Sequence, residues 1–194
     1  MPPEKDAFQE WKNNVNIAWW VCLIHQRCIV VPLRKWWGVQ ALGTSCALGL
    51  LLMIFWAAFA GDPFLWGWVG IWLISFIARR WEATRLARRG VMVHSQYDGW
   101  PGGTIRVGRT ERIAKLIVEP ALIGLFGYAV LLLYEQQGWS PYGLPYFLLA
   151  GCFSLPFVEL VKQTIWERRT QAMADARIEQ QQVMENYRQR YGDS

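Results

Sequence analysis

The sequence RRWEATRLARRGVMVHSQYDGWPGGTIRVGRTERIAK, residues 79–115, decides how this chain is organised. It is a basic, polar stretch between two apolar blocks, and each block is long enough to enter a lipid bilayer. Near-continuous apolar runs of roughly 15 to 22 residues match a hydrocarbon core about 30 Å thick. A water-soluble helix would instead keep a polar face toward solvent. The pattern therefore predicts a membrane protein with a polar insert between two transmembrane hairpins.

The overall composition supports the same class of protein. Hydrophobic residues make up 53% of the 194 residues and 13 residues are Trp, which exceeds the usual range for soluble domains. The net charge of +5 comes from Lys and Arg beside the apolar blocks. This placement fits anionic lipid headgroups and argues against nucleic acid as a partner. The four Cys are too scattered for a disulfide framework, and no cleavable signal peptide is expected.

The N-terminal region, residues 1–38, is expected to be a cytoplasmic tail followed by an amphipathic helix in the membrane interface. Its two apolar runs, residues 17–24 and 28–33, are separated by a polar stretch that contains Arg27. An arginine at the centre of a span costs about 2.5 to 3.5 kcal/mol. We therefore expect the Trp residues at headgroup depth and the basic residues toward lipid phosphates. The sequence leaves open whether residues 15–33 lie in the membrane or cross it.

The first transmembrane hairpin is predicted at residues 39–78. Residues 39–60 carry no charge and form the strongest predicted span, and residues 64–78 form a shorter return leg. The sequence Gly-Asp-Pro between them, residues 61–63, suits a tight turn because proline cannot continue the preceding helix. Four glycines are expected to let the two helices approach closely: Gly43, Gly49, Gly67 and Gly70.

The second transmembrane hairpin is predicted at residues 116–161, with spans at 117–134 and 144–161. Residues 162–194 are predicted to form a cytoplasmic helical tail with a weak heptad pattern. No Lys or Arg lies in the short loop inside either hairpin, so both termini and the insert are expected on the cytoplasmic side of the cell (inner) membrane. The predicted fold is all-α and polytopic, with five segments: 1–38, 39–78, 79–115, 116–161 and 162–194.

The insert is predicted to hold a basic helical extension and a small β-hairpin. Residues 81–89 continue a helix, and residues 91–97 and 104–107 alternate apolar and polar side chains as paired strands do. The loop between these strands is rich in Tyr, Trp and Arg, a composition that suits contact with a protein or with lipid headgroups. The candidate contact residues are His94, Tyr97, Asp98, Trp100, Arg106 and Arg109.

Two acidic residues, Glu119 and Glu159, are candidates for an intramembrane site. Each lies near the cytoplasmic end of its predicted span, and antiparallel packing of these spans would bring both to a similar depth. Carboxylates inside a membrane are costly and often mark ion or proton sites. The simpler alternative is that they pair with Lys115, Lys162 or arginines of the insert.

No catalytic or metal-binding motif in the sequence is complete. Cys22, His25 and Cys28 share a broad helix face and could bind zinc with His94, but two paired ligand groups are absent. Residues 103–110, GTIRVGRT, resemble a phosphate-binding loop but lack its α/β context and its lysine. The His, Ser and Asp of residues 94–98 are too close in sequence to form a triad. We therefore expect no metal and no cofactor.

These patterns predict a non-catalytic membrane subunit or scaffold of a larger protein assembly. The insert and the tail would dock membrane or cytoplasmic proteins, or a second copy of the chain. The alternative is a small oligomeric transporter or channel subunit that uses Glu119 and Glu159. A third hypothesis, a lipid-modifying enzyme, would require His94, Asp98 or Glu119 to be essential for turnover.

Overall fold

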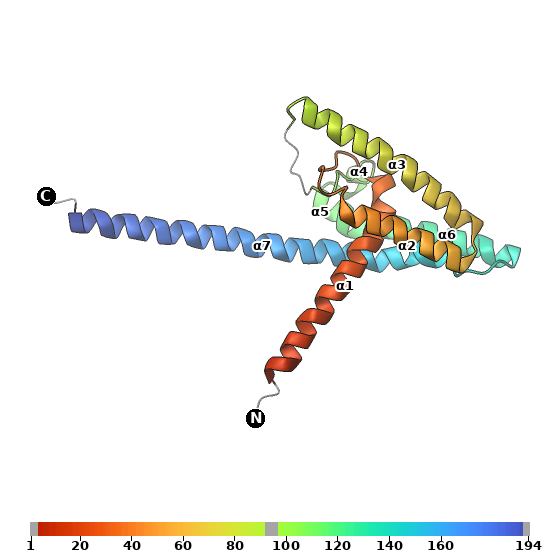
Figure 1. Ribbon diagram of the computed structural model, residues 1–194, viewed down its shortest axis with the longest axis horizontal. Helices are drawn as coiled ribbons and strands as arrows, with labels where there is room; N and C mark the ends of the chain where they lie inside the picture. Colours follow the sequence, from red (N-terminus) through yellow and green to blue (C-terminus); the bar gives the residue numbers. More distant parts are fainter. Residues whose placement is uncertain (1–3, 92–96, 192–194) are drawn as a thin grey trace. The chain divides into compact units, whose positions relative to one another are not determined.

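The computed structural model describes the backbone of residues 4–91 and 97–191, and the side chains of residues 16–91 and 97–185. The described residues are helical and contain no β-strand. Two compact units divide the chain, Met1–Glu159 and Leu160–Ser194. The long helices are α1 (Glu4–Leu33), α2 (Thr44–Ala60), α3 (Pro63–Arg88), α6 (Glu119–Gln137) and α7 (Leu144–Tyr191), and between α3 and α6 lie the short helices α4 (Ile105–Gly108) and α5 (Glu111–Ile113) and the π-helix η1 (Ala114–Val118) (Figure 1).

Three of the described helical segments are long and apolar enough to cross a membrane: Asn16–Leu33, Glu111–Gln137 and Leu144–Glu185. This agrees with the prediction of an all-helical chain with membrane-spanning segments. The helix in the strongest predicted span, α2, begins at Thr44 and not at Val39, and its 17 residues make a shorter apolar helix. The residues before it form turns that end at Gly43.

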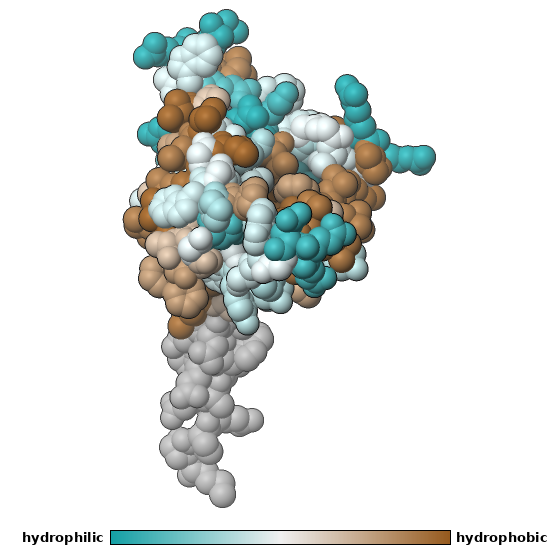
Figure 2. All heavy atoms as spheres, turned by 90° about the vertical axis from the view of Figure 1, so that its right-hand side faces the viewer, coloured by the Kyte–Doolittle hydropathy of each residue, from teal (hydrophilic) through white to brown (hydrophobic). Residues whose placement is uncertain are grey.

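Large apolar side chains lie on the outside of the first unit as well as in its core. Phe59, Ile74 and Phe153 are 82%, 72% and 80% exposed. In the face drawn in Figure 2, brown hydrophobic residues cover much of the visible surface. A water-soluble protein of this size rarely leaves so much apolar surface uncovered, whereas lipid covers it at no cost.

The α2–α3 turn forms as predicted and is held by the Asp62 carboxylate. Gly61 ends α2 in the left-handed conformation (φ 62°), and Asp62 caps α3 by accepting a hydrogen bond from the Phe64 amide at 2.9 Å. Asp62 is buried and also accepts hydrogen bonds from the Tyr134 hydroxyl and, at 2.7 Å, from the Leu144 amide. One carboxylate thus joins the start of α3, the end of α6 and the start of α7.

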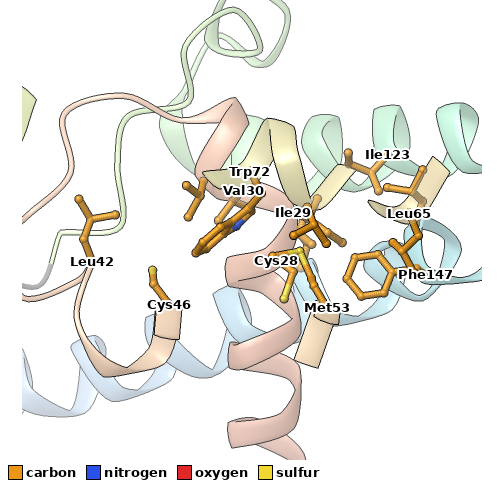
Figure 3. Close-up of a cluster of buried hydrophobic side chains, with 14 of the residues drawn as sticks. Cys28, Ile29, Val30, Leu42, Cys46, Met53, Leu65, Trp72, Ile123 and Phe147 are labelled. Atoms are coloured by element: carbon orange, nitrogen blue, oxygen red, sulfur yellow. The ribbon is translucent and has the colours of Figure 1, made fainter. Parts of the chain in front are cut away.

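The C-terminal part of helix α1 lies in the core of the first unit, which corrects the expected interfacial helix within residues 1–38 for this part. Its residues Cys28, Ile29, Val30 and Val31 are fully buried among side chains from α2, α3, α6 and α7 (Figure 3). An amphipathic helix on the membrane surface would bury only one face. Apolar side chains surround this part of α1 on several sides, because four other helices pack around it.

Pro32 explains how one of two tryptophans of α3 attaches to α1. Proline has no amide hydrogen, so the carbonyl of Cys28, four residues earlier, loses its helical donor. The Trp68 indole N–H donates to this carbonyl at 3.2 Å, and the Trp72 indole donates to the carbonyl of Arg27 at 2.9 Å. The proline therefore creates an acceptor on α1 that α3 uses.

Close helix contacts occur at glycines, but at only one of the four that the sequence singled out for helix packing. A Cβ on Gly49 would lie 3.2 Å from the Cys28 sulfur, so α2 packs closely on α1 there. Gly67 and Gly70 face open space, and the Gly43 contact is with its own turn. The tightest contacts between helices are at α6 and α7, where added Cβ atoms would meet neighbouring side chains at 2.4 to 3.1 Å: Gly124, Gly127 and Gly151.

The predicted β-hairpin of the insert is wrong for the part that the structure describes. Residues 105–107 of its second arm lie in α4, and residues 92–96 of its first arm lie outside the described residues. The backbone of the insert pairs instead with the segment after α1. Lys35 and Trp100 exchange two backbone hydrogen bonds, at 3.0 and 2.5 Å, and the Gly38 amide donates to the Tyr97 carbonyl. The loop reaches a distant partner because the end of α1 lies beside it.

The second unit, Leu160–Ser194, is helical from Leu160 through Tyr191, where α7 ends. All of its described side chains from residue 164 to residue 185 are exposed. Six of them are large and apolar, with exposures from 39% to 67%: Ile165, Trp166, Met173, Ile178, Val183 and Met184. The predicted helical tail is confirmed for these residues.

Candidate functional site

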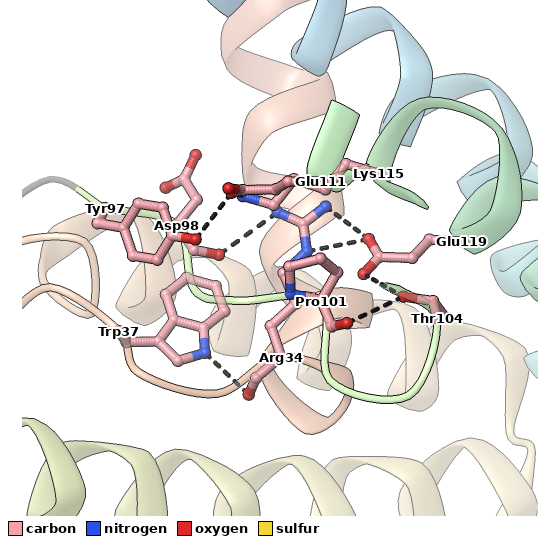
Figure 4. Close-up of polar contacts among 9 residues, drawn as sticks. All are labelled: Arg34, Trp37, Tyr97, Asp98, Pro101, Thr104, Glu111, Lys115 and Glu119. Carbon is pink, nitrogen blue, oxygen red and sulfur yellow. Dashed lines mark hydrogen bonds and ion pairs between the residues drawn. The ribbon is translucent and has the colours of Figure 1, made fainter. Parts of the chain in front are cut away.

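The Arg34 guanidinium forms the centre of a buried polar network where α1 meets the insert. Arg34 follows the last residue of α1 and is completely buried. Its Nε and Nη2 atoms donate to Oε2 of Glu119 at 2.9 and 2.6 Å, and Nη1 donates to the Asp98 carbonyl at 3.4 Å (Figure 4). Burial disfavours the charged guanidinium, but Glu119 and the more distant Glu159 and Asp98 outweigh it, so the pKa of Arg34 lies above its ordinary value.

A second buried ion pair joins Arg27 of α1 to Asp98 of the insert. Arg27 lies seven residues before Arg34, so both arginines point from one face of the helix. The Arg27 guanidinium also lies over the Trp37 ring, 5.1 Å from its centroid. Among the described residues, no acceptor is within hydrogen-bonding distance of Arg27 Nε or Nη1. Arg27 is therefore held by one carboxylate and one aromatic face.

A third ion pair lies within the insert and meets the phenol of Tyr97. The Tyr97 hydroxyl donates to Oε1 of Glu111 at 2.7 Å, and Lys115 Nζ donates to the same oxygen at 2.6 Å. Lys115 also lies 4.8 Å from the centroid of the Tyr97 ring. Burial raises the pKa of Tyr97, and the hydrogen bond to Glu111 and its negative charge raise it further. The phenol is therefore neutral at physiological pH and acts as a donor.

The charges of the three ion pairs cancel. The cations are Arg27, Arg34 and Lys115, the anions are Asp98, Glu111 and Glu119, and three minus three leaves zero. Desolvating each of these ions alone costs several kcal/mol, which only a close partner and good hydrogen bonds offset. The network therefore ties the insert to α1 in one specific arrangement.

The π-helix η1 places Glu119 toward Arg34. Pro120 cannot donate a backbone hydrogen bond, and the preceding turn widens so that the Glu119 amide reaches the Ala114 carbonyl, five residues earlier. A Cβ on Gly108 would lie 2.7 Å from the Ala114 amide nitrogen, so α4 packs directly on η1. The Thr104 hydroxyl then reaches Oε1 of Glu119 at 3.4 Å.

The structure brings only some of the predicted contact residues together. Tyr97 and Asp98 lie in the network, and Asp98 is buried because its carboxylate pairs with Arg27. Trp100 is partly buried and contacts the Trp36 ring, with centroids 6.2 Å apart. Arg106 and Arg109 are exposed on the insert. His94 lies outside the described residues.

The two acidic candidates differ in their surroundings. Glu119 is 1% exposed and pairs with Arg34, which is not among the partners that the sequence suggested. It also lines a cavity of about 250 Å³ whose walls are mainly apolar, with Leu33, Trp68 and Phe126 among them. Glu159 is partly buried on α7, close enough for its charge to favour the Arg34 cation.

Sequence reasoning missed the basic half of this site. Arg27 and Arg34 were expected to face lipid phosphates, but they are 5% and 0% exposed and pair with carboxylates of the insert and of α6. Their seven-residue spacing was the available signal, because it places both on one helix face. The carboxylate partners lie 71 and 85 positions away, so no local pattern connects them.

The residues of the incomplete motifs make ordinary internal contacts. The two ring nitrogens of His25 lie 2.7 Å from the Ser154 hydroxyl and 3.1 Å from the Phe147 carbonyl. The Cys28 thiol lies 3.2 Å from the carbonyls of Ile24 and Gly49. In the segment GTIRVGRT, residues 105–108 are α4, and Thr110 caps α5 by accepting from the Ile113 amide. Over the described part of the chain, no cluster of three or more His, Cys, Asp or Glu residues could hold a metal ion.

The site is a charge-neutral junction of three ion pairs. Arg27 and Asp98 tie the insert to α1, and Arg106 and Arg109 of the insert are exposed. No protein-family profile, curated protein or solved structure matches the chain, so its function has to be inferred from its own residues.

Proposed function

We propose that the chain is a non-catalytic, multi-pass membrane subunit that acts as a scaffold in a larger protein assembly. The observation that carries this proposal is the tail, whose six large apolar side chains are exposed along a continuous helix. Helix propensity alone gives little stability in water, and most helical stability in proteins comes from packing an apolar face. A helix of this kind is therefore completed by a partner that covers its apolar side chains.

The insert provides the second docking surface. The buried Arg27–Asp98 ion pair holds it against α1, so its exposed residues are presented in a defined position. A preorganised surface loses less conformational entropy on binding than a free loop does. Arg106, Val107 and Arg109 are exposed there and are the residues that we assign to partner contact.

The membrane arrangement that we propose has two transmembrane hairpins, one made by α2 and α3 and one by α6 and α7. The loops within these hairpins, residues 61–62 and 138–143, contain no Lys or Arg, and the positive residues gather in the insert and near the termini. This distribution supports a cytoplasmic location of the insert and both termini at a cell (inner) membrane. Helix α1 runs across α2 (Figure 1), and its residues 28–31 are buried in the core of the first unit, as expected for a helix embedded among the hairpins.

The orientation is tested with reporters of sidedness fused to each terminus of the full chain. Cytoplasmic signals from both ends are expected. A reporter at the N-terminus that lies outside, with the C-terminus inside, would mean that α1 crosses the membrane as a further span.

The scaffold function is tested by co-purification from native membranes in mild detergent. The tail variant replaces Trp166, Met173 and Met184 with serine, and the matched control replaces exposed polar residues of the same helix: Gln171, Asp175 and Glu179. A partner retained in stoichiometric amount by the wild type and the control, but lost from the tail variant, is the expected result. Equal recovery by all three proteins would refute docking through the tail.

A transporter or channel subunit is the second candidate, because Glu119 lines the apolar cavity of about 250 Å³ and Glu159 acts on the same guanidinium. On this hypothesis the two carboxylates carry an ion or proton. Replacing both with glutamine would abolish flux in reconstituted vesicles while assembly persists. Unchanged flux in the double variant would refute the transporter hypothesis. The absence of any flux with the wild type would also refute it.

A further inference from the structure

The C-terminal half of α3 carries an open groove that changes from apolar to cationic along the helix. We call it the α3 basic groove. Phe76 and Ile77 line one end, Trp81 and Thr84 the middle, and Arg80, Arg85 and Arg88 the cationic part. Its volume is about 740 Å³, and most of its lining surface is apolar. Such a lining suits an amphiphile better than a purely ionic ligand.

The arginines of this groove are largely without acidic partners. Residues 79–89 contain five Arg and one Glu, and five minus one leaves a charge of +4. Within the described residues, the one ion pair of this segment joins Arg79 to Glu82. Arg80 donates to the Leu42 carbonyl at 3.3 Å, and the Arg85 guanidinium lies over the Trp81 ring at 4.6 Å. The guanidinium groups of Arg85 and Arg88 are therefore available to an anion.

The position of the groove along α3 matches the dimensions of a bilayer. Arg80 lies 17 residues after Pro63, about 26 Å along the helix axis at 1.5 Å per residue, and Arg88 lies about 38 Å along it. The hydrocarbon core is about 30 Å thick. A helix that enters at the α2–α3 turn thus brings Phe76 and Ile77 to acyl-chain depth and the arginines to the phosphates of the opposite leaflet.

We propose that the α3 basic groove binds one anionic phospholipid. Arg85 and Arg88 hold the headgroup phosphate, since the guanidinium fork matches its paired oxygens. Trp81 lies at the interface, as tryptophans at membrane surfaces do, and the acyl chains lie along Phe76 and Ile77. The proposal rests on the membrane insertion of α3 that the proposed function includes.

Two other anionic partners fit the groove less well. Nucleic acid would be bound by a wide basic surface, whereas the cationic part here is bordered by apolar side chains along the same helix. An acidic protein segment would satisfy the arginines but leave Phe76 and Ile77 without a ligand. The graded lining therefore favours a lipid.

The test is native mass spectrometry of the full chain in detergent with added phosphatidylglycerol or phosphatidylcholine. The variant is R85Q/R88Q, and the matched control is R168Q/R169Q, which removes two exposed arginines from the tail. We expect phosphatidylglycerol to bind the wild type and the control, and to bind R85Q/R88Q roughly 30-fold more weakly. All four arginines are exposed, so these changes leave the core intact.

Three results would overturn the proposal. Equal phosphatidylglycerol binding by R85Q/R88Q and the wild type would place the lipid elsewhere. Equal binding of phosphatidylcholine and phosphatidylglycerol by the wild type would show that the groove does not recognise the headgroup charge. Glycerol phosphate lacks acyl chains. If it competed for the groove as well as the lipid does, the groove would be a site for free phosphate.

Alkaline carbonate extraction of the wild type distinguishes a failure of the lipid-site proposal from a failure of the proposed function. Wild-type protein that carbonate releases from membranes is not inserted, and both proposals then fail. Protein that resists extraction but binds lipid without selectivity leaves the scaffold proposal intact and refutes only the lipid site.

Discussion

Arg34 and Glu119 lie 85 positions apart in the sequence and form a buried ion pair, in which Nε and Nη2 both donate to one carboxylate oxygen at 2.9 and 2.6 Å. Their side chains are 0% and 1% exposed. The pair links the end of α1 to the start of α6. Because both side chains are buried, each charge is stabilised mainly by its partner. The energetic coupling between the two residues can be measured.

Removing one member of this pair should destabilise the protein strongly. We expect Arg34→Met or Glu119→Gln to lower the free energy of unfolding by about 3 to 5 kcal/mol, because the remaining polar group is left buried without its partner. The double variant R34M/E119M should lose much less than the sum of the single changes. Chemical unfolding in detergent, followed by circular dichroism, measures the difference. The partly buried pair Arg79 and Glu82, within one helix, is the control, with an expected loss below about 1 kcal/mol on Arg79→Ala. Additive losses for Arg34 and Glu119 would contradict the ion pair.

The Trp68 indole should stabilise the protein through the acceptor that Pro32 creates. Trp68→Phe removes the donor to the Cys28 carbonyl, and we expect a loss of about 1 kcal/mol. In a Pro32→Ala background the new amide at position 32 satisfies that carbonyl, so the same tryptophan change should cost less. A double-mutant cycle of thermal stability gives the coupling. A loss from Trp68→Phe that is the same in both backgrounds would assign the effect to packing alone.

The contacts between α6 and α7 should tolerate no side chain at their glycines. A Cβ on Gly151 would lie 2.4 Å from the Ile29 side chain and one on Gly124 would lie 2.4 Å from the Cys152 sulfur. We expect Gly151→Val to push α7 away from Ile29 of α1 and Ile123 of α6, and to cost about 1 to 3 kcal/mol through overpacking. Gly70→Ala is the matched control, since nothing lies within 4 Å of its added Cβ, and it should be neutral or slightly stabilising. Melting temperatures in one detergent compare the two variants.

The Asp62 carboxylate should be needed to hold the start of α3, the end of α6 and the start of α7 together. Asp62→Ala removes the acceptor for the Phe64 amide, the Tyr134 hydroxyl and the Leu144 amide, and we expect a loss of about 2 to 4 kcal/mol. Tyr134→Phe removes one of these donors and should cost about 1 kcal/mol. Protection of the Leu144 amide from hydrogen exchange should fall in Asp62→Ala and persist in Tyr134→Phe. Unchanged protection in both variants would show that the carboxylate does not hold α7.

Ionisation of Tyr97 should weaken the protein at alkaline pH. Burial and the Glu111 carboxylate raise its pKa in the folded state, so the folded protein holds this proton more tightly than the unfolded chain does. The stabilisation is complete below the ordinary tyrosine pKa of about 10 and is lost as pH rises through the higher pKa of the folded state. Unfolding of the wild type and Tyr97→Phe between neutral pH and pH values above about 10 measures it. The wild type should lose stability more steeply than the variant, and parallel curves would exclude this role.

Local signals in the sequence were sufficient for several elements. The uncharged runs predicted helices where α2, α3, α6 and the start of α7 lie, and Gly61, Asp62 and Pro63 predicted the turn between α2 and α3. The failure in the insert has an equally local cause, because alternating side chains at residues 104–107 favour a strand when no neighbour is considered. In the structure α4 packs on η1 at Gly108, and this contact overrides the local preference.

By itself, the sequence determined that this is an all-helical chain with segments apolar enough to span a membrane, a basic insert and a polar helical tail, because length, hydropathy and turn residues act over short distances. Only the tertiary structure decided where the charges lie. A polar residue within an apolar run is compatible with a membrane surface or with a buried partner, and the choice depends on which side chain packs beside it. For Arg27 and Arg34 those partners are Asp98 and Glu119, which folding brings next to α1 from the distant insert and the start of α6.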